Sequence, residues 1–180
     1  AAGHQVLGLS RAAMPELPPG ATPVQGDPAE PGPWQERLAS CDACVNLAGE
    51  PVAAGRWTDE RKRRIRESRL LSAGRVAEVL AAGGPRVLIQ GSAVGYYGER
   101  GDEELTERSA AGEGFLADTC RDWEAAASPA SARTRVVWLR TGIVLDHVSF
   151  RYPDGTRNVL DDISFTIRPG EVVGGRHAPP

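Results

Sequence analysis

Two hydrophobic patterns alternate along the first 145 residues. Apolar runs typical of buried strands occur at residues 5–9, 43–49, 87–89 and 135–145. Between the later runs, apolar residues recur at helical spacing. An alternation of strand and helix is typical of a parallel sheet with crossover helices, so we predict the α/β fold class.

Three segments are predicted to be helical. A short helix is expected at residues 34–40, and a long helix follows Thr58, whose hydroxyl can cap it. Gly83-Gly84-Pro85 is expected to end the long helix, because glycine and proline terminate helices. The last helix is expected over residues 113–127, where Ser128-Pro129 stops it.

Two segments depart from this alternation. Residues 15–33 contain half of the 14 prolines and are predicted to be loop or extended chain, with a brief edge strand near Val24. After residue 145, polar and apolar positions alternate at 148–152 and 163–167, which predicts a short antiparallel β segment with a turn at Pro153-Asp154-Gly155. Residues 174–180 are expected to be a disordered tail.

Composition narrows the class of protein. The chain of 180 residues is 41% hydrophobic and 25% charged, which fits one globular domain. A net charge of −3 gives no electrostatic reason to expect a nucleic-acid partner. No apolar run reaches the ~20 residues of a membrane span, and residues 1–4 lack the features of a signal peptide, so we expect a cytoplasmic location.

Two clusters of side chains have competing interpretations. Cys41 and Cys44 form a lone C-x-x-C, and without a second pair we interpret them as small residues entering a strand, not as a zinc or redox site. No metal site is predicted. The long helix carries a basic run, which we interpret as a solvated face, with phosphate or partner binding as the alternative. The run consists of Arg61, Lys62, Arg63, Arg64 and Arg66.

Five motifs in order carry a family resemblance. They are Asn46–Pro51, Arg56–Thr58, Ser92–Gly98, Asp122–Glu124 and Leu139–Gly142. Over about residues 3–145 the chain closely resembles an atypical branch of the extended short-chain dehydrogenase/reductases, the epimerase or sugar-nucleotide epimerase-like family. The resemblance implies a Rossmann-like parallel sheet, a nicotinamide dinucleotide across the carboxyl ends of the strands, and epimerase or oxidoreductase chemistry on a small-molecule substrate.

The resemblance also implies which residues bind the cofactor. Arg11 follows the strand expected to meet the adenosine ribose, and an arginine there can pair with a 2′-phosphate, so NADP is favoured over NAD. The alternative is that Arg11 simply begins the proline-rich loop. The full set of expected cofactor-binding residues is Ser10, Arg11, Asn46, Ala48, Gly49, Arg69, Ser92 and Thr141.

The catalytic candidates depart from the family pattern. Ser92 matches the serine that hydrogen-bonds the substrate in the wider superfamily. The acid/base pair Tyr-x-x-x-Lys, however, falls on Leu116 and Cys120, and Arg69 stands where extended members usually carry asparagine. Tyr97 or its neighbour Tyr96 is a candidate replacement acid, with packing as the alternative. Cys120 is a candidate nucleophile, although no histidine lies nearby in sequence to activate it.

Two further departures concern nucleotide phosphates. The sequence contains no T-G-x-x-G-x-x-G loop before its first strand, so we expect an incomplete Rossmann-like domain over residues 1–145. Residues 146–173 resemble the first strands of an ABC-transporter ATPase domain, with Tyr152 at the adenine-stacking position. This segment is not followed by the phosphate loop G-x-x-x-x-G-K-[ST].

These departures make weak or absent activity the expectation, for a fragment of an NAD(P)-binding epimerase or oxidoreductase. One alternative is an ATP-binding fragment of a transporter. Another is a non-catalytic structural remnant that pairs with another chain, of which a homo-oligomer would be one form.

Overall fold

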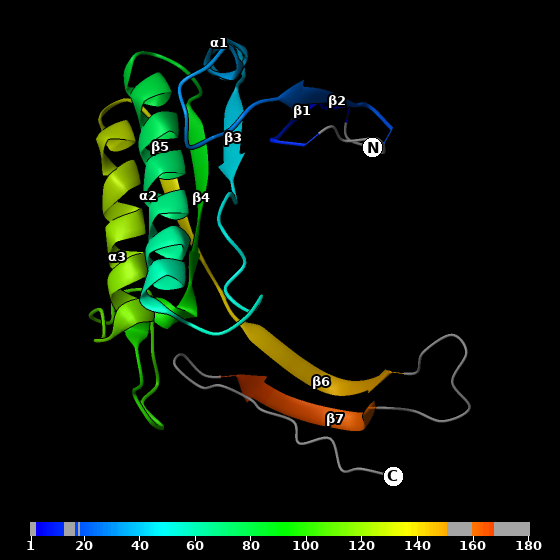
Figure 1. Ribbon diagram of the computed structural model, residues 1–180, viewed down its shortest axis with the longest axis vertical. Helices are drawn as coiled ribbons and strands as arrows, with labels where there is room; N and C mark the ends of the chain where they lie inside the picture. The colour runs from blue at the N-terminus through cyan, green and yellow to red at the C-terminus, as the bar shows by residue number, and fades with distance from the viewer. Residues whose placement is uncertain (1–2, 13–16, 18, 151–159, 168–180) are drawn as a thin grey trace. The chain divides into compact units, whose positions relative to one another are not determined.

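The computed structural model describes residues 3–12, 17, 19–150 and 160–167 (Figure 1). Tyr152, the predicted turn at 153–155 and the predicted tail at 174–180 lie outside the described residues. The chain packs as two compact units. The first unit consists of residues 1–92 and 119–139, and the second consists of residues 93–118 and 140–180.

A three-stranded sheet is the centre of the first unit. Its strand order is β3 (Ala43–Asn46), β4 (Val87–Ala93) and β5 (Arg135–Thr141). β3 and β4 are parallel, with Asn46 opposite Gln90, which confirms the predicted parallel pairing. β4 continues from the predicted apolar run 87–89 to Ala93, and the short 3-10 helix η1 (Val94–Tyr97) follows it.

The proline-rich segment contains a full strand that the sequence predicted only as a brief one. β1 (Val6–Ser10) and β2 (Ala21–Gln25) form a separate two-stranded parallel sheet. Pro23 lies within β2, opposite Gly8. Proline has no N–H to donate, so it is tolerated in a strand at the edge of a sheet, and β2 has this position in the described sheet.

Three helices form where the sequence predicts them. They are α1 (Trp34–Ala39), α2 (Asp59–Ala81) and α3 (Phe115–Ala127), and the 3-10 helix η2 (Ser128–Ala132) follows α3. Thr58 caps α2, since its hydroxyl accepts a hydrogen bond of 3.2 Å from the amide of Arg61.

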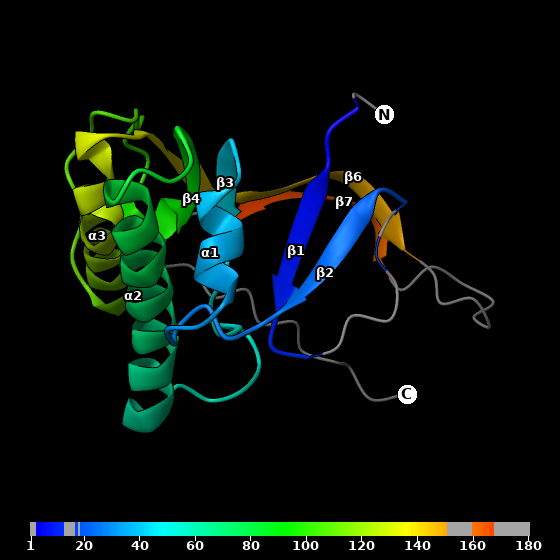
Figure 2. The ribbon, with the colours of Figure 1, turned by 90° about the horizontal axis from the view of Figure 1, so that it is seen from above.

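The helices and the sheet enclose one core. Figures 1 and 2 show α2 and α3 side by side, and an ion pair between Arg66 and Asp122 connects them. Their inner faces pack with β4 and α1 into a hydrophobic cluster that includes Trp34, Ala73, Leu80, Leu88 and Trp123. No helix in the part of the chain described here has the length and apolar character needed to cross a bilayer.

The second unit contains the antiparallel pair that the change of pattern predicted. β6 (Ile143–Phe150) and β7 (Leu160–Ile167) are antiparallel, with Ile143 opposite Ile167. The prediction of one strand over residues 135–145 was wrong, because β5 ends at Thr141 and β6 begins after Gly142. Glycine weakens a strand and often marks a bend between strands, which explains the break.

Candidate functional site

The carboxyl ends of β3 and β4 bring two predicted site residues to the same edge of the sheet. Asn46 is the last residue of β3 and lies opposite Gln90, so Ser92 is two residues further along the neighbouring parallel strand. Thr141 is the last residue of β5, which is the other neighbour of β4. In open α/β sheets, this edge is where ligands bind.

The side chains of Asn46 and Ser92 are directed into the protein. Both are buried, with exposed fractions of 5% and 4%. Asn46 Nδ2 donates to Gln90 Oε1 at 3.1 Å, and Ser92 Oγ donates to Glu124 Oε1 on α3 at 2.7 Å. The two side chains therefore take part in buried polar contacts, and their roles toward cofactor or substrate stay predictions.

The loop after β3 is held by hydrogen bonds to Asn46 and to side chains of α2. Asn46 Oδ1 accepts from the amide of Ala48 at 3.2 Å. The amide of Glu50 donates to Ser68 Oγ at 2.9 Å, and the carbonyl of Glu50 accepts from Arg69 Nη1 at 2.9 Å. The loop backbone is thus fixed to α2, while Gly49 remains exposed.

Arg69, a predicted cofactor-binding residue, lies under this loop. Its Nη1 also donates to the carbonyl of Ile65 at 2.9 Å, and its Cζ lies 5.1 Å from the ring centroid of Trp123. Burial lowers the pKa of Arg69 from its ordinary value, and the nearby Cys120 and Glu50 partly offset that effect. The structure therefore directs this guanidinium toward loop backbone and an aromatic ring.

The predicted adenosine-ribose residues lie at the end of a different sheet. Ser10 is the last residue of β1, and its carbonyl accepts a hydrogen bond of 3.0 Å from the amide of Gly26. Arg11 follows it and is exposed. β1 is hydrogen-bonded to β2 and not to the β3-β4-β5 sheet in the described residues.

In the second unit, Tyr97 is buried beside a cation. Its hydroxyl accepts a hydrogen bond of 2.9 Å from Arg140 Nη1, and the Arg140 Cζ lies 3.6 Å from the ring centroid of Tyr96. The guanidinium is thus held by both tyrosines, the packing role that was the alternative to catalysis. A catalytic role for Tyr97 stays a prediction.

The three cysteines are free thiols. Cys120 is buried. Burial, and to a lesser extent Cys41, raises the pKa of Cys44 to about 11. A raised pKa disfavours the thiolate that a zinc or redox site requires. Among the residues that the structure describes, no group of three or more acidic, cysteine or histidine side chains is placed to hold a metal ion.

Sequence reasoning missed three residues that organise the strand ends. Glu124 receives the Ser92 hydroxyl, and the only signal for it was its place in the Asp122–Glu124 motif. Ser68 had no signal. Arg61 was interpreted as part of a solvated face, but it is 9% exposed and its Nη2 donates to the carbonyl of Pro51 at 2.5 Å.

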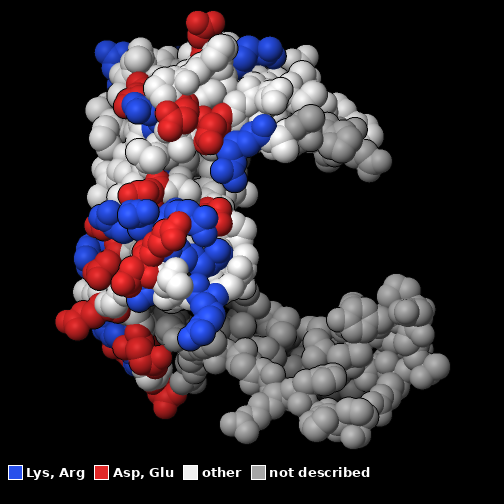
Figure 3. All heavy atoms as spheres, in the orientation of Figure 1, with Lys and Arg blue, Asp and Glu red and all other residues white. Residues whose placement is uncertain are grey.

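The solvated-face interpretation holds better for the rest of the basic run. Arg63 has an exposed side chain 4.0 Å from Glu67, and Arg66 pairs with Asp122 at 2.6 Å. Figure 3 shows basic and acidic side chains intermingled on this face of the molecule. Opposite charges so mixed do not form the single-sign surface that attracts a polyanion.

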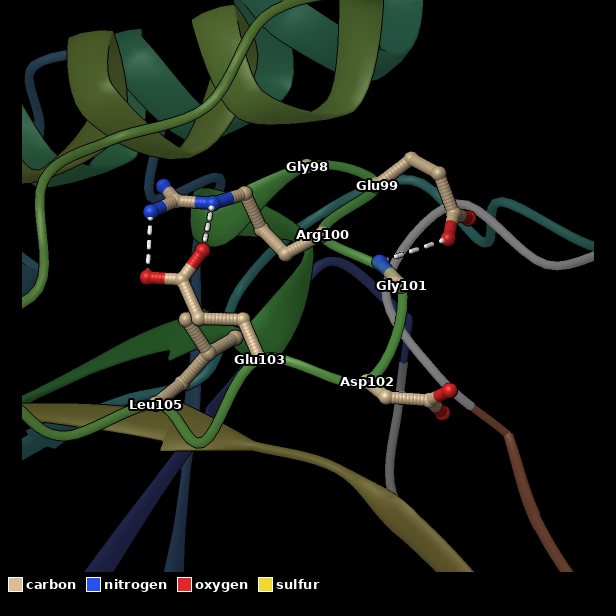
Figure 4. A pocket seen from close by; sticks show the side chains of 7 residues that line it. All are labelled: Gly98, Glu99, Arg100, Gly101, Asp102, Glu103 and Leu105. Atoms are coloured by element: carbon tan, nitrogen blue, oxygen red, sulfur yellow. Dashed lines mark hydrogen bonds and ion pairs between the residues drawn. The ribbon is translucent and has the colours of Figure 1, made fainter.

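A small hollow lies in the second unit, in the loop after η1 (Figure 4). Its volume is about 200 Å³, and residues of the segment 98–105 line it. Arg100 pairs with Glu103 at 2.7 Å, and Glu99 Oε1 accepts from the amide of Gly101 at 3.2 Å. No predicted site residue lines this hollow, so it carries no argument about the strand ends.

Comparison with known proteins decides the family. The model of the NAD dependent epimerase/dehydratase family matches residues 1–144. The chain belongs to this family. An epimerase family protein of Mycobacterium bovis is 40% identical over 147 residues, covering 81% of this chain and 47% of the relative.

Solved structures agree with the family assignment. A nucleoside-diphosphate sugar epimerase from Corynebacterium glutamicum is 42% identical with a TM-score of 0.62, covering 80% of this chain and 29% of that one. The human epimerase family protein SDR39U1, solved with NADPH, is 29% identical with a TM-score of 0.61, covering 80% of this chain and 47% of that one.

These matches cover only part of the length of the related proteins. The chain spans about half the length of the curated relatives it matches, 47% for the M. bovis protein. The family match ends at residue 144, and the comparisons give no support to the ATPase resemblance of residues 146–173.

Proposed function

We propose that this chain binds a nicotinamide dinucleotide at the carboxyl ends of β3 and β4. The observation that carries the proposal is the parallel pairing that brings the ends of these strands to one edge of the sheet in a member of this family. Asn46 and Ser92 are buried, so the exposed backbone at Gly49 and the half-buried Ala48 supply the contact surface after β3. Small residues there allow a ribose to approach the backbone closely.

The preferred cofactor in this proposal is NADP. Arg11 is an exposed cation directly after the strand predicted to meet the adenosine ribose, where it can pair with a 2′-phosphate. The human relative was solved with NADPH, which supports the same choice. Ser10 and Thr141 complete the set of residues proposed to touch the cofactor, and Arg69 lies at the same strand end, where it donates to the carbonyl of Glu50.

The proposed chemistry is epimerisation or oxidoreduction of a small molecule, with a sugar nucleotide as the substrate class. The C. glutamicum relative is a nucleoside-diphosphate sugar epimerase, which supports this class. Ser92, Tyr97 and Cys120 are the catalytic candidates. Leu116 and Cys120 occupy the positions of the acid/base pair, and leucine cannot transfer a proton, so weak or absent turnover is expected.

Location and assembly complete the proposal. Three free thiols support a reducing compartment, and we propose the cytosol. Self-association into a homo-oligomer is also proposed, and light scattering of the purified protein tests it.

Nucleotide titration tests the proposed function. NADPH, NADH and ATP are titrated separately into the full chain, with binding followed by calorimetry. Saturable binding of NADPH, weaker binding of NADH and no heat from ATP is the expected result. Binding of ATP without NADPH would overturn the proposal and favour the alternative ATP-binding function of residues 146–173.

A further inference from the structure

We propose that Arg69 is a positioning residue that holds the loop after β3 in the shape required for cofactor binding. This inference rests on the proposed function, because it concerns the same strand end. It differs from the sequence-based prediction, in which Arg69 itself touches the cofactor. The loop in question consists of residues 47–51, and we call it the strand-end loop.

The first observation is that α2 satisfies the backbone of this loop on one side. Glu50 uses both its amide and its carbonyl to bond side chains of α2, namely Ser68 and Arg69. The carbonyl of Pro51 accepts from Arg61, whose Nη1 also lies 3.8 Å from Glu50 Oε1. A charged donor strengthens such a hydrogen bond, so two arginines fix consecutive carbonyls.

The second observation is that Arg69 itself has little freedom to move. Its Nη1 is shared between the carbonyls of Glu50 and Ile65, and its guanidinium lies over the Trp123 ring. Stacking on an aromatic ring and a planar set of donors distinguish arginine from lysine at such a place. The guanidinium therefore makes its described contacts with groups of the protein itself.

The third observation is a steric match between Arg69 and Gly49. A Cβ on Gly49 would lie 2.9 Å from Arg69 Cζ, closer than Cβ atoms approach other atoms in proteins, and 3.1 Å from its Nη1, which is a tight contact. A side chain at position 49 would therefore displace the guanidinium from the loop. Gly49 and Arg69 therefore form a pair, in which the glycine leaves the space that the guanidinium occupies.

A double-mutant cycle tests this pairing. Gly49→Ala, Arg69→Ala and the double variant are compared with the wild-type chain for NADPH affinity. Each single change is expected to weaken binding about tenfold, as loss of one charge-assisted hydrogen bond does. The double variant is expected to lose less affinity than the sum of the two single losses, because the Cβ at position 49 no longer meets the guanidinium, although it still faces the ribose. Additive losses would overturn the pairing.

Two further variants distinguish positioning of the loop from direct contact with the cofactor. Arg69→Lys keeps the charge but not the planar donors, and it is expected to bind as weakly as Arg69→Ala. Full rescue by lysine, or a salt-dependent loss typical of a phosphate contact, would indicate direct cofactor binding and overturn the inference. Arg63→Ala is the matched control, because Arg63 is an exposed arginine on the same helix.

The rate of amide hydrogen exchange in the peptide that covers the strand-end loop tests the inference in the absence of cofactor. Exchange at Glu50 is expected to speed up in Arg69→Ala and to stay unchanged in Arg63→Ala. Unchanged exchange in Arg69→Ala would overturn the inference, and so would faster exchange with unaltered NADPH affinity. If the wild-type chain binds no NADPH, the proposed function fails, and exchange alone decides whether Arg69 holds the loop.

Discussion

The two faces of the β3-β4-β5 sheet differ in what covers them. On one face, Leu88 and Gln90 are fully buried, and Leu88 packs with residues of α2 and α3. On the other face, Val45 is 60% exposed and Leu139 is 43% exposed. Parallel sheets are usually covered on both faces, and their strands are then apolar throughout. The strands here have that composition, but the described part of the chain covers only one face.

The comparison also shows which site residues belong to the interior. Asn46, Gln90 and Ser92 share the covered face, and their polar groups are bonded to one another, to nearby backbone or to Glu124. A buried polar group without a partner is costly, so these contacts stabilise the sheet whether or not a cofactor binds. Substitutions on the two faces should therefore have very different consequences.

The largest difference is expected for leucine-to-alanine changes. Leu88→Ala removes a fully buried side chain and is expected to lower the free energy of unfolding by about 2–5 kcal/mol. Leu139→Ala, on the open face of the same sheet, is expected to cost less than about 1 kcal/mol. Urea denaturation followed by circular dichroism measures both. Equal losses would mean that Leu139 is covered in solution.

A smaller effect is expected for the buried hydroxyl of Ser92. Ser92→Ala removes the 2.7 Å hydrogen bond to the Glu124 carboxylate and is expected to cost about 1–3 kcal/mol. Ser40→Ala is the matched control, because Ser40 makes a 2.8 Å hydrogen bond to the carbonyl of Arg37 at an exposed position. Thermal unfolding of both variants checks the prediction. A loss of stability no larger than that of the control would show that the hydrogen bond between Ser92 and Glu124 does not stabilise the fold.

Much of this fold was predictable because local patterns determine it. Thr58 marks the start of α2, and Gly83-Gly84-Pro85 its end, through capping and termination that need no distant partner. β2 was harder to predict, because five residue pairs with β1 outweigh the poor strand propensity around Pro23 only after the chain has folded.

The places of the candidate residues along the strands were predictable, but the directions of their side chains were not. Strand ends can be located from sequence, and Asn46 and Ser92 do lie on neighbouring strands. Which face a side chain takes depends on the register and on where the helices pack, and an unbroken apolar run contains no alternation that would reveal it. The burial of Arg61 within a basic run has the same cause, since only the folded loop brings the carbonyl of Pro51 to it.

Two adjacent valines sharpen the comparison further. Val136 packs against the core, whereas Val137 is exposed on the opposite face of β5. Threonine keeps the β-branched shape and adds a hydroxyl, so Val136→Thr is expected to cost about 1 kcal/mol through desolvation of that group. Val137→Thr is expected to change stability by less than about 0.5 kcal/mol. Denaturant midpoints of the two variants provide the measurement. A larger loss of stability in Val137→Thr than in Val136→Thr would contradict this assignment of the two faces.

The last effect is expected only at alkaline pH and concerns Cys44 on β3. Burial is the larger cause and Cys41 the smaller cause of the rise in the pKa of Cys44 from 9.0 to about 11. Between these two pH values the unfolded chain loses the thiol proton while the folded chain keeps it. The contribution of this thiol to stability is therefore complete below pH 9 and is lost as the pH rises toward 11.

Urea unfolding at pH 8, 9, 10 and 11 under reducing conditions measures this dependence. The free energy of unfolding of the wild-type chain is expected to fall relative to that of Cys44→Ala as the pH rises above 9. Cys41→Ala is expected to retain most of this slope, because burial beneath the helices, rather than the neighbouring thiol, is the main cause. A constant difference between the wild-type chain and Cys44→Ala across this range would show that Cys44 is not desolvated, and would place it with the exposed residues of the sheet.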